Sequence, residues 1–158
     1  MKLLMVCIGN ICRSPLAEGI LHDKLKKAGL DFFVDSAGMI SYHVGEQPDH
    51  RSIDVARKNG IDITGQRARK FSQSDFEKFD LIFAMDEEVF DEILSLTNNK
   101  NQKEKVHLFL EYAGEPTGSD VPDPYYGSKS DFENVFDLVN RASEKIVEKF
   151  ISGKEFKI

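Results

Sequence analysis

The chain alternates short apolar runs with longer stretches in which apolar residues recur every three or four positions. The first run, Leu3-Leu4-Met5-Val6, is uninterrupted and predicts a strand buried on both faces. A helical pattern follows, carried by Leu16, Ala17, Ile20, Leu21, Leu25 and Ala28. We place the N-cap of this helix at Ser14, its first position at Pro15 and its end at Gly29.

The same alternation continues to the C-terminus. Further strands are predicted over residues 32–34, 81–84 and 106–109, with a turn at Ala37-Gly38 after the first of them. Helices are predicted over residues 53–59, 89–94 and 132–150. Apolar strands separated by helices indicate an α/β fold with three layers, in which helices cover both faces of a four-stranded parallel sheet. We expect a single domain over residues 1–158.

Two stretches lack a periodic pattern, residues 38–50 and 111–128. Long irregular segments inside a compact domain are usually binding loops or disordered. The second stretch contains Asp120, Asp123, Tyr125 and Tyr126, which makes it a candidate cover over an active site. Ligands of a parallel sheet bind at the carboxyl ends of its strands, so the first strand points to where that site lies.

Composition narrows the class of protein. The 158 residues include 27 acidic and 21 basic ones, for a net charge of −6, with 41% apolar and 30% charged residues, as in ordinary globular proteins. No apolar run approaches the roughly 18 residues of a membrane span, so we expect a cytoplasmic protein without a membrane partner. A pI near 5.2 without a basic stripe argues against nucleic acid. Scattered histidines and two cysteines give no metal-ligand spacing, and we expect neither metal nor cofactor.

The candidate chemistry lies in one loop, Cys7-Ile8-Gly9-Asn10-Ile11-Cys12-Arg13-Ser14-Pro15, between the first strand and the first helix. Such a loop directs successive backbone N–H groups into a concavity that suits a phosphate-like dianion. Gly9 and Asn10 tolerate positive φ and allow a tight curl. Arg13 supplies a planar fork for two oxygens, and these donors together favour a nucleophilic thiolate at Cys7.

A cysteine that follows an apolar strand is most often only a small buried apolar side chain. Here the spacing argues against that interpretation, because cysteine, five residues, arginine and then Ser-Pro at a strand-to-helix junction is a specific pattern. The sequence therefore favours a phosphate-binding loop with a catalytic cysteine.

With this loop the chain resembles the low-molecular-weight protein tyrosine phosphatase family, and the resemblance covers nearly the whole length. Its other motifs are Val34-Asp35-Ser36-Ala37-Gly38, Gly60-Ile61, Ala68-Arg69, Ala84-Met85-Asp86 and Asp123-Pro124-Tyr125-Tyr126. The resemblance implies that Cys7 is the nucleophile, Arg13 the phosphate clamp and Asp123 the general acid and base. It also implies that Asn10, Ser14 and Ser36 support the loop, and that the loop residues bind the phosphate, namely Ile8, Gly9, Asn10, Ile11, Cys12 and Ser14.

The chain departs from the family pattern at three positions. Gln66 stands where the family usually has a histidine in the loop-supporting network, and an amide can still donate and accept there. Tyr42 replaces a common tryptophan on the rim, and Val89 replaces a common asparagine, for which we assign no consequence. Tyr42, Tyr125 and Tyr126 are candidate aromatic walls around a substrate ring, although rim tyrosines are as often plain surface residues.

The expected reaction is the hydrolysis of phosphotyrosine in proteins or peptides, and of small aryl phosphates, through a phosphocysteine, with phosphate and vanadate as ligands. A related branch that acts on phosphoarginine typically has threonine where this chain has Ile11, so Ile11 favours the tyrosine branch. Arsenate reduction would need further cysteines, which the chain lacks beyond Cys12. A phosphate-binding or flavin-binding module without catalysis would not require Cys7 or Asp123.

Cys12 leaves two interpretations open. It lies at the other end of the loop from Cys7 and could capture an oxidised Cys7 as a disulfide, which would make it a redox partner. Alternatively, Cys12 only packs beneath the loop.

Overall fold

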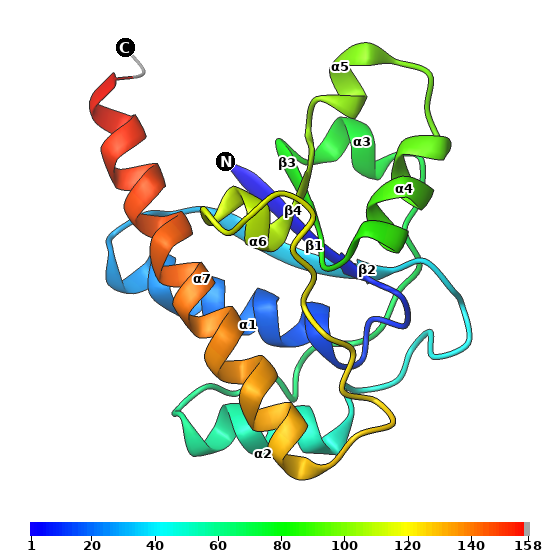
Figure 1. Ribbon diagram of the computed structural model, residues 1–158, viewed down its shortest axis with the longest axis vertical. Coiled ribbons are helices and arrows are strands. Elements are labelled where there is room, and N and C mark those ends of the chain that lie inside the picture. Colours follow the sequence, from blue (N-terminus) through cyan, green and yellow to red (C-terminus); the bar gives the residue numbers. More distant parts are fainter. Residues whose placement is uncertain (157–158) are drawn as a thin grey trace.

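Four parallel strands form the central sheet in the order β2-β1-β3-β4 (Figure 1). Their bounds are Lys2–Cys7 (β1), Phe33–Gly38 (β2), Leu81–Ala84 (β3) and Val106–Leu108 (β4). The structure is a computed structural model that describes residues 1–156, so the last two residues of the expected domain lie outside the described residues. Helices lie on both faces of the sheet, which confirms the predicted fold class.

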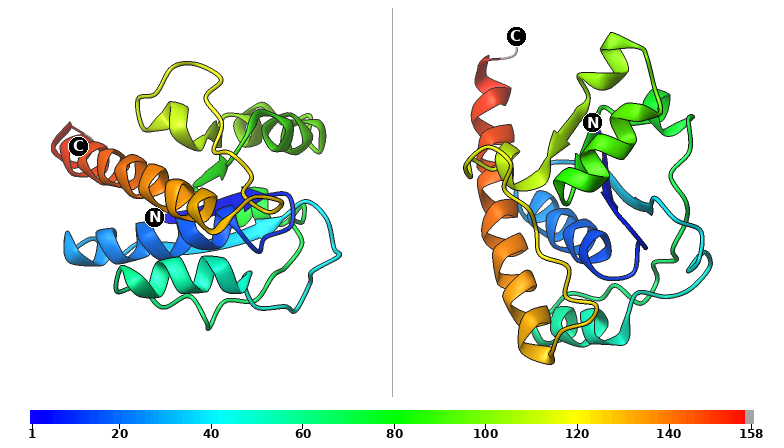
Figure 2. Two further views of the ribbon diagram at one scale, coloured as in Figure 1. Left: turned by 60° about the horizontal axis from the view of Figure 1, so that its bottom comes forward. Right: turned by 45° about the vertical axis from the view of Figure 1, so that its right-hand side comes forward.

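Seven helices accompany the strands in the described part of the chain. They are Arg13–Lys27 (α1), His50–Lys58 (α2), Asp75–Lys78 (α3), Glu87–Ser95 (α4), Lys100–Lys103 (α5), Phe109–Tyr112 (α6) and Lys129–Phe156 (α7). Figure 2 shows α1, α2 and α7 on one side of the sheet, and α3 and α4 on the other. Within residues 1–156 no helix combines the length and the apolarity needed to cross a membrane.

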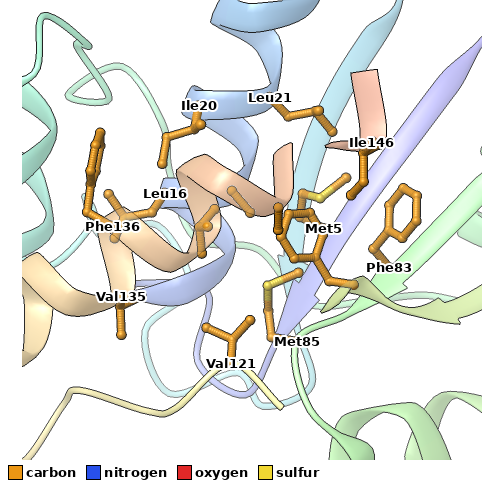
Figure 3. Close-up of a cluster of buried hydrophobic side chains, with 14 of the residues drawn as sticks. Met5, Leu16, Ile20, Leu21, Phe83, Met85, Val121, Val135, Phe136 and Ile146 are labelled. Atoms are coloured by element: carbon orange, nitrogen blue, oxygen red, sulfur yellow. The ribbon is translucent and has the colours of Figure 1, made fainter. Parts of the chain in front are cut away.

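The alternation of side chains along β1 divides the core into two clusters. Leu3 and Met5 point toward α1 and α7, whereas Leu4 and Val6 point toward α3 and α4. Figure 3 shows the first cluster, in which Met5 and Phe83 lie near Ile146 of the long C-terminal helix. Because β1 is buried on both faces, the loop that follows it starts from a fixed position.

The start of α1 differs from the prediction. The helix begins at Arg13, the cap position is Cys12, and no side chain caps it. Ser14 is therefore not the N-cap, because its hydroxyl bonds to the sulfur of Cys7 instead. The predicted end is confirmed: Gly29 has a positive φ of 75°, and the N–H of Leu30 bonds back to the carbonyl of Leu25.

The second strand also differs, because β2 continues to Gly38 where a turn was predicted at Ala37-Gly38. The polar pair Asp35 and Ser36 interrupts the apolar run, yet both residues pair with β1 through their backbones. Gly38 is needed at the end of this strand, since a Cβ there would lie 2.8 Å from the carbonyl oxygen of Ile8.

The remaining differences are small. Helix α2 starts at His50, three residues before the predicted start, because Asp49 caps it. Phe109 begins α6 and is not part of β4. The four-residue helices α3, α5 and α6 were not predicted, since so short a segment carries little periodic signal.

A core truncation tests the packing of α1 on the sheet. Ile20 is fully buried in the first cluster, so Ile20→Ala is expected to lower the free energy of unfolding by about 2–5 kcal/mol. Ile151→Ala is the matched control, because Ile151 is 44% exposed on α7 and should cost less than about 0.5 kcal/mol. Urea titration measures both, and equal midpoints for the two variants would contradict the packing described.

Candidate active site

The loop between β1 and α1 wraps around the sulfur of Cys7. The Sγ atom lies 3.0 Å from the hydroxyl of Ser14 and accepts the backbone N–H of Asn10 at 3.3 Å. Asn10 has a positive φ of 59°, and it is the one non-glycine residue with positive φ within residues 1–156. Its amide Nδ2 donates to Ser14 Oγ at 2.8 Å. Since Ser14 Oγ accepts there, its own proton is free to point at the sulfur and stabilise a thiolate.

The same amide ties the loop to the neighbouring strand. Asn10 Nδ2 also donates to Ser36 Oγ at 2.9 Å, and Asn10 Oδ1 accepts the backbone N–H of Arg69 at 3.0 Å. Ser36 Oγ in turn donates to Glu18 Oε1 at 2.6 Å. A continuous chain of hydrogen bonds therefore runs from Glu18 on α1 through Ser36, Asn10 and Ser14 to Cys7.

The guanidinium of Arg13 is buried and held by hydrogen bonds. Its side chain is 2% exposed, and Nη1 donates to Asp86 Oδ2 at 2.6 Å and to the carbonyl of Val121 at 3.0 Å. Asp86 is the N-cap of α4, and its Oδ1 atom accepts the backbone N–H of Val89. This bond fixes the Asp86 carboxylate. The side chain of Val89 packs into the second core cluster. The Nη1 atom of Arg13 is thus fixed by two hydrogen bonds, while its Nη2 atom faces Asp123.

The structure distinguishes the two candidate acids. Asp123 Oδ2 lies 3.7 Å from Arg13 Nη2, and the Asp123 side chain is 46% exposed at the cavity. Asp120 instead accepts the backbone N–H of Glu87 at 2.9 Å, at the start of α4. Asp120 therefore has a structural role, and Asp123 is the carboxylate that lines the cavity.

A cavity of about 450 Å³ opens above the sulfur of Cys7. It is lined by the predicted residues Cys7, Ile8, Gly9, Ile11, Cys12, Arg13, Tyr42, Asp123, Tyr125 and Tyr126, and also by Ile40 and His43. His43 packs edge-on against Tyr42 at 4.8 Å between ring centroids, and Tyr125 packs edge-on against Tyr126 at the same distance. The mouth of the cavity is therefore aromatic and its floor is polar.

Three predicted residues lie behind this surface. Asn10, Ser14 and Ser36 are buried and bond to one another, as the loop-supporting role requires. Gln66 does not join them: its Nε2 donates to the carbonyl of Pro15 at 3.1 Å. Gln66 therefore supports the first turn of α1 through the backbone.

Several residues of the site were not predicted. Asp86 lies two residues after the end of β3, and its place at the carboxyl end of a parallel strand was a signal that could have identified its role. Glu18 is one of the few acidic residues on α1, but nothing in the sequence indicates that it bonds to Ser36. Ile40 and His43 lie in an irregular segment whose path the pattern does not predict.

The two cysteines have different surroundings. Both are free thiols, but Cys12 packs with Ile11, Ala68 and Phe132, and its burial, with smaller contributions from Asp49 and Cys7, raises the pKa of its thiol. Cys12 is therefore a neutral thiol, whereas the sulfur of Cys7 has two hydrogen-bond donors. Among the side chains that the structure describes, no group of three or more from His, Cys, Asp or Glu is placed to hold a metal ion.

Fold and site together define a class of protein: a three-layer α/β fold with a cysteine inside a loop that suits a phosphate-like anion. Residues 2–155 match the family described as "Low molecular weight phosphotyrosine protein phosphatase". The chain belongs to this family, and it is a protein tyrosine phosphatase. The resemblance stated from the motifs is thereby confirmed.

Individual relatives agree with this assignment. The low molecular weight phosphotyrosine protein phosphatase of Schizosaccharomyces pombe is 44% identical over 138 residues, which cover 85% of this chain and 87% of that protein. A protein tyrosine phosphatase of Entamoeba histolytica, solved with Hepes in its active site, superimposes with a TM-score of 0.90 at 38% identity, covering 98% and 99% of the two chains. The structure of DARP, a Drosophila arginine phosphatase, has a TM-score of 0.87 at 33% identity and covers 95% and 98%.

The buried carboxyl of Glu18 predicts a pH-dependent stability. Burial, and to a lesser degree Asp35, raises the pKa of Glu18 from 4.5 to about 7, against the opposing hydrogen bond from Ser36. The folded protein therefore binds this proton more tightly than the unfolded chain, and the resulting stabilisation is complete below pH 4.5 and lost as the pH rises through 7.

Glu18→Gln removes this titration and keeps an acceptor for Ser36. Between pH 5 and pH 8, the free energy of unfolding of the unchanged protein should fall relative to that of the variant by on the order of 2 kcal/mol. Urea titrations at the two pH values measure this difference. If the free energies of unfolding of the two proteins differed by the same amount at pH 5 and pH 8, the raised pKa of Glu18 would be contradicted.

Proposed function

We propose that Cys7 attacks the phosphorus of a bound phosphotyrosine while Arg13 and the loop N–H groups hold its oxygens and Asp123 protonates the leaving phenolate. The observation that carries this proposal is the placement of the Cys7 sulfur, which accepts two hydrogen bonds at the floor of the cavity that Arg13 and Asp123 also line. A thiolate in such a position is a nucleophile, and Arg13 together with the loop N–H groups stabilises charge on the phosphoryl oxygens.

The reaction has two steps. In the first, an S–P bond forms as the bond from phosphorus to the phenolic oxygen breaks, and the proton of Asp123 moves to that oxygen. In the second, water attacks the phosphocysteine, Asp123 takes a proton from that water, and the S–P bond breaks to restore the Cys7 thiolate. No step needs a metal or an organic cofactor.

The shape of the cavity supports an aromatic substrate. Its floor is polar, whereas Tyr42, Tyr125 and Tyr126 stand at its mouth, where rings can pack on the phenyl group of phosphotyrosine. We expect phosphate and vanadate to bind on the same loop as competitors. The physiological partners are then tyrosine-phosphorylated proteins or peptides, and the reduced state that Cys7 requires fits the cytoplasm.

Phosphoarginine is a second candidate substrate, because the similar Drosophila protein is an arginine phosphatase. Ile11 lines the cavity in this chain, where the arginine branch typically has threonine. We therefore expect a higher kcat/KM for phosphotyrosine than for phosphoarginine, and the reverse ranking would favour the second candidate.

The proposed redox role of Cys12 stays a prediction. Both thiols lie in one short loop, so the sulfenic acid of an oxidised Cys7 could condense with the thiol of Cys12 and release water. A Cys12→Ser variant that recovers from peroxide on adding dithiothreitol as fully as the unchanged protein would contradict this role.

Replacing the nucleophile should separate chemistry from binding. Cys7→Ser leaves a hydroxyl that stays protonated at neutral pH, while Arg13 and the loop N–H groups remain in place. We expect no measurable hydrolysis of p-nitrophenyl phosphate, with vanadate binding retained in a calorimetric titration. Substantial remaining turnover would exclude Cys7 as the nucleophile.

Replacing the acid should give a loss that depends on the leaving group. Asp123→Asn is expected to lower kcat/KM for phosphotyrosine by about 10²- to 10⁴-fold, the usual contribution of a general acid. Aryl phosphates with much more acidic phenols should lose less, because their leaving groups need little protonation. Asp120→Asn is the control and should change both substrates little. A steep leaving-group dependence in the Asp120 variant alone would reverse the assignment.

A further inference from the structure

The start of α2 is bonded to the phosphate-binding loop. The backbone N–H of Asp49 donates to the carbonyl of Ile11 at 2.8 Å, and the hydroxyl of Ser52 donates to the carbonyl of Cys12 at 3.3 Å. The two acceptors are the carbonyls of consecutive loop residues, just before Arg13. The first turn of α2 is therefore a fixed neighbour of the catalytic thiol.

From this turn, Arg51 reaches the segment that carries Asp123. Its Nη2 donates to the carbonyl of Tyr125 at 3.0 Å, and its Nη1 donates to the carbonyl of Gly127 at 3.4 Å. The guanidinium also lies over the ring of Phe132 on α7, 4.3 Å from its centroid. Figure 2 shows the segment before α7 descending to the first turn of α2. Arg51 thus joins two loops that are far apart in the sequence.

The contact with Tyr125 bears directly on Asp123. Asp123 Oδ1 accepts the backbone N–H of Tyr125 at 3.1 Å, so the carboxylate and the carbonyl that Arg51 binds belong to one tight turn. The guanidinium lies 5.9 Å from the centre of the Tyr125 ring, which lines the cavity. A shift of the Tyr125 backbone would therefore move the acid and one wall of the cavity together.

Asp49 holds Arg51 in its orientation. Its two carboxylate oxygens accept from Nε at 3.0 Å and from Nη2 at 2.9 Å, a bidentate geometry that only the planar guanidinium allows. Burial acts to raise the pKa of Asp49, but the hydrogen bonds from Arg51 outweigh it and hold that pKa below its ordinary value. The pair is therefore charged at the mildly acidic pH of a phosphatase assay.

The other end of the Asp123 segment has its own anchors. The N–H of Val121 donates to the carbonyl of Met85 at 2.8 Å, and the carbonyl of Val121 accepts from Arg13 at 3.0 Å. Only Pro122-Asp123-Pro124 lies between these anchors and Tyr125. Removal of Arg51 therefore loosens one end of a short segment and leaves the other end attached to the sheet.

We propose that Arg51 is a positioning residue that holds Asp123 in place to protonate the leaving-group oxygen. This inference rests on the proposed function, because it acts through the proposed acid. It assigns Arg51 no contact with the phosphoryl group. Its loss should impair proton transfer and leave oxyanion binding intact.

The test compares Arg51→Met with Arg57→Met. Methionine keeps the apolar stem over Phe132 but removes every donor, whereas Arg57 lies on the same helix, is 66% exposed and pairs with Asp54. For Arg51→Met, we expect kcat/KM for phenyl phosphate to fall about tenfold and that for dinitrophenyl phosphate to fall less than about twofold. Inhibition by vanadate should be unchanged, and Arg57→Met should match the unchanged protein throughout.

Two further variants test whether Arg51 acts through Asp123. Arg51→Lys retains a single donor and should show an intermediate loss with the same leaving-group dependence, and it replaces Arg51→Met if that variant does not fold. Adding Arg51→Met to Asp123→Asn should cause no further loss, because the acid is already absent.

The outcomes separate this inference from the function on which it depends. Equal losses for both substrates, no loss, or additive losses in the double variant would overturn the role of Arg51 while Asp123→Asn kept its leaving-group dependence. If Asp123→Asn itself showed no such dependence, the assignment of the acid would fail and the role of Arg51 would fail with it.

Discussion

The hydrogen bonds of the Asn10 side chain are the interaction on which the rest of the site depends. Asn10 occupies the left-handed region, which costs a non-glycine residue about 1–2 kcal/mol. Its amide makes two buried hydrogen bonds, to Ser14 and Ser36, and a part-buried one to the backbone of Arg69, and each typically contributes about 1 kcal/mol net. The bonds therefore offset the strain and hold the loop in its curled form.

The curled loop gives its two cysteines different chemistry. Cys7 ends a buried strand, and its sulfur receives donors from Asn10 and Ser14 at the floor of an open cavity. Cys12 is five residues further on, and it packs beside Ala68 and Phe132, where burial keeps its thiol neutral. The different surroundings of the two thiols thus come from the path of the backbone and not from the residue type.

The loop and its flanking elements could be predicted because their signals are local. The apolar run of β1, the periodic face of α1 and the spacing from Cys7 to Arg13 all lie within one short stretch of chain. What failed depended on side-chain contacts that the pattern does not show, even within the loop. Ser14 reads as a helix cap, but its hydroxyl is taken by Cys7 and Asn10.

Long-range contacts explain the other omissions. The predicted strand ends at residue 34, yet β2 continues to Gly38, and the polar side chains of Asp35 and Ser36 pair with Arg69 and Glu18. Asp86 appears in the sequence only as part of a motif without a role, and Arg51 is not singled out, because their partners lie 73 and 74 positions away. Local patterns point to Cys7 and Arg13 as the candidate nucleophile and clamp, whereas the residues that orient the site become visible only in three dimensions.

We infer that the folded loop makes Cys7, and not Cys12, the reactive thiol of an anion site. Alkylation by iodoacetamide at pH 5.5, followed by peptide mapping, measures the reactivity of each cysteine. We expect a single adduct on Cys7 that phosphate or vanadate prevents, and slower labelling of Cys7 in an Asn10→Ala variant. Equal labelling of both cysteines, or labelling of Cys7 that is indifferent to phosphate and vanadate, would contradict it.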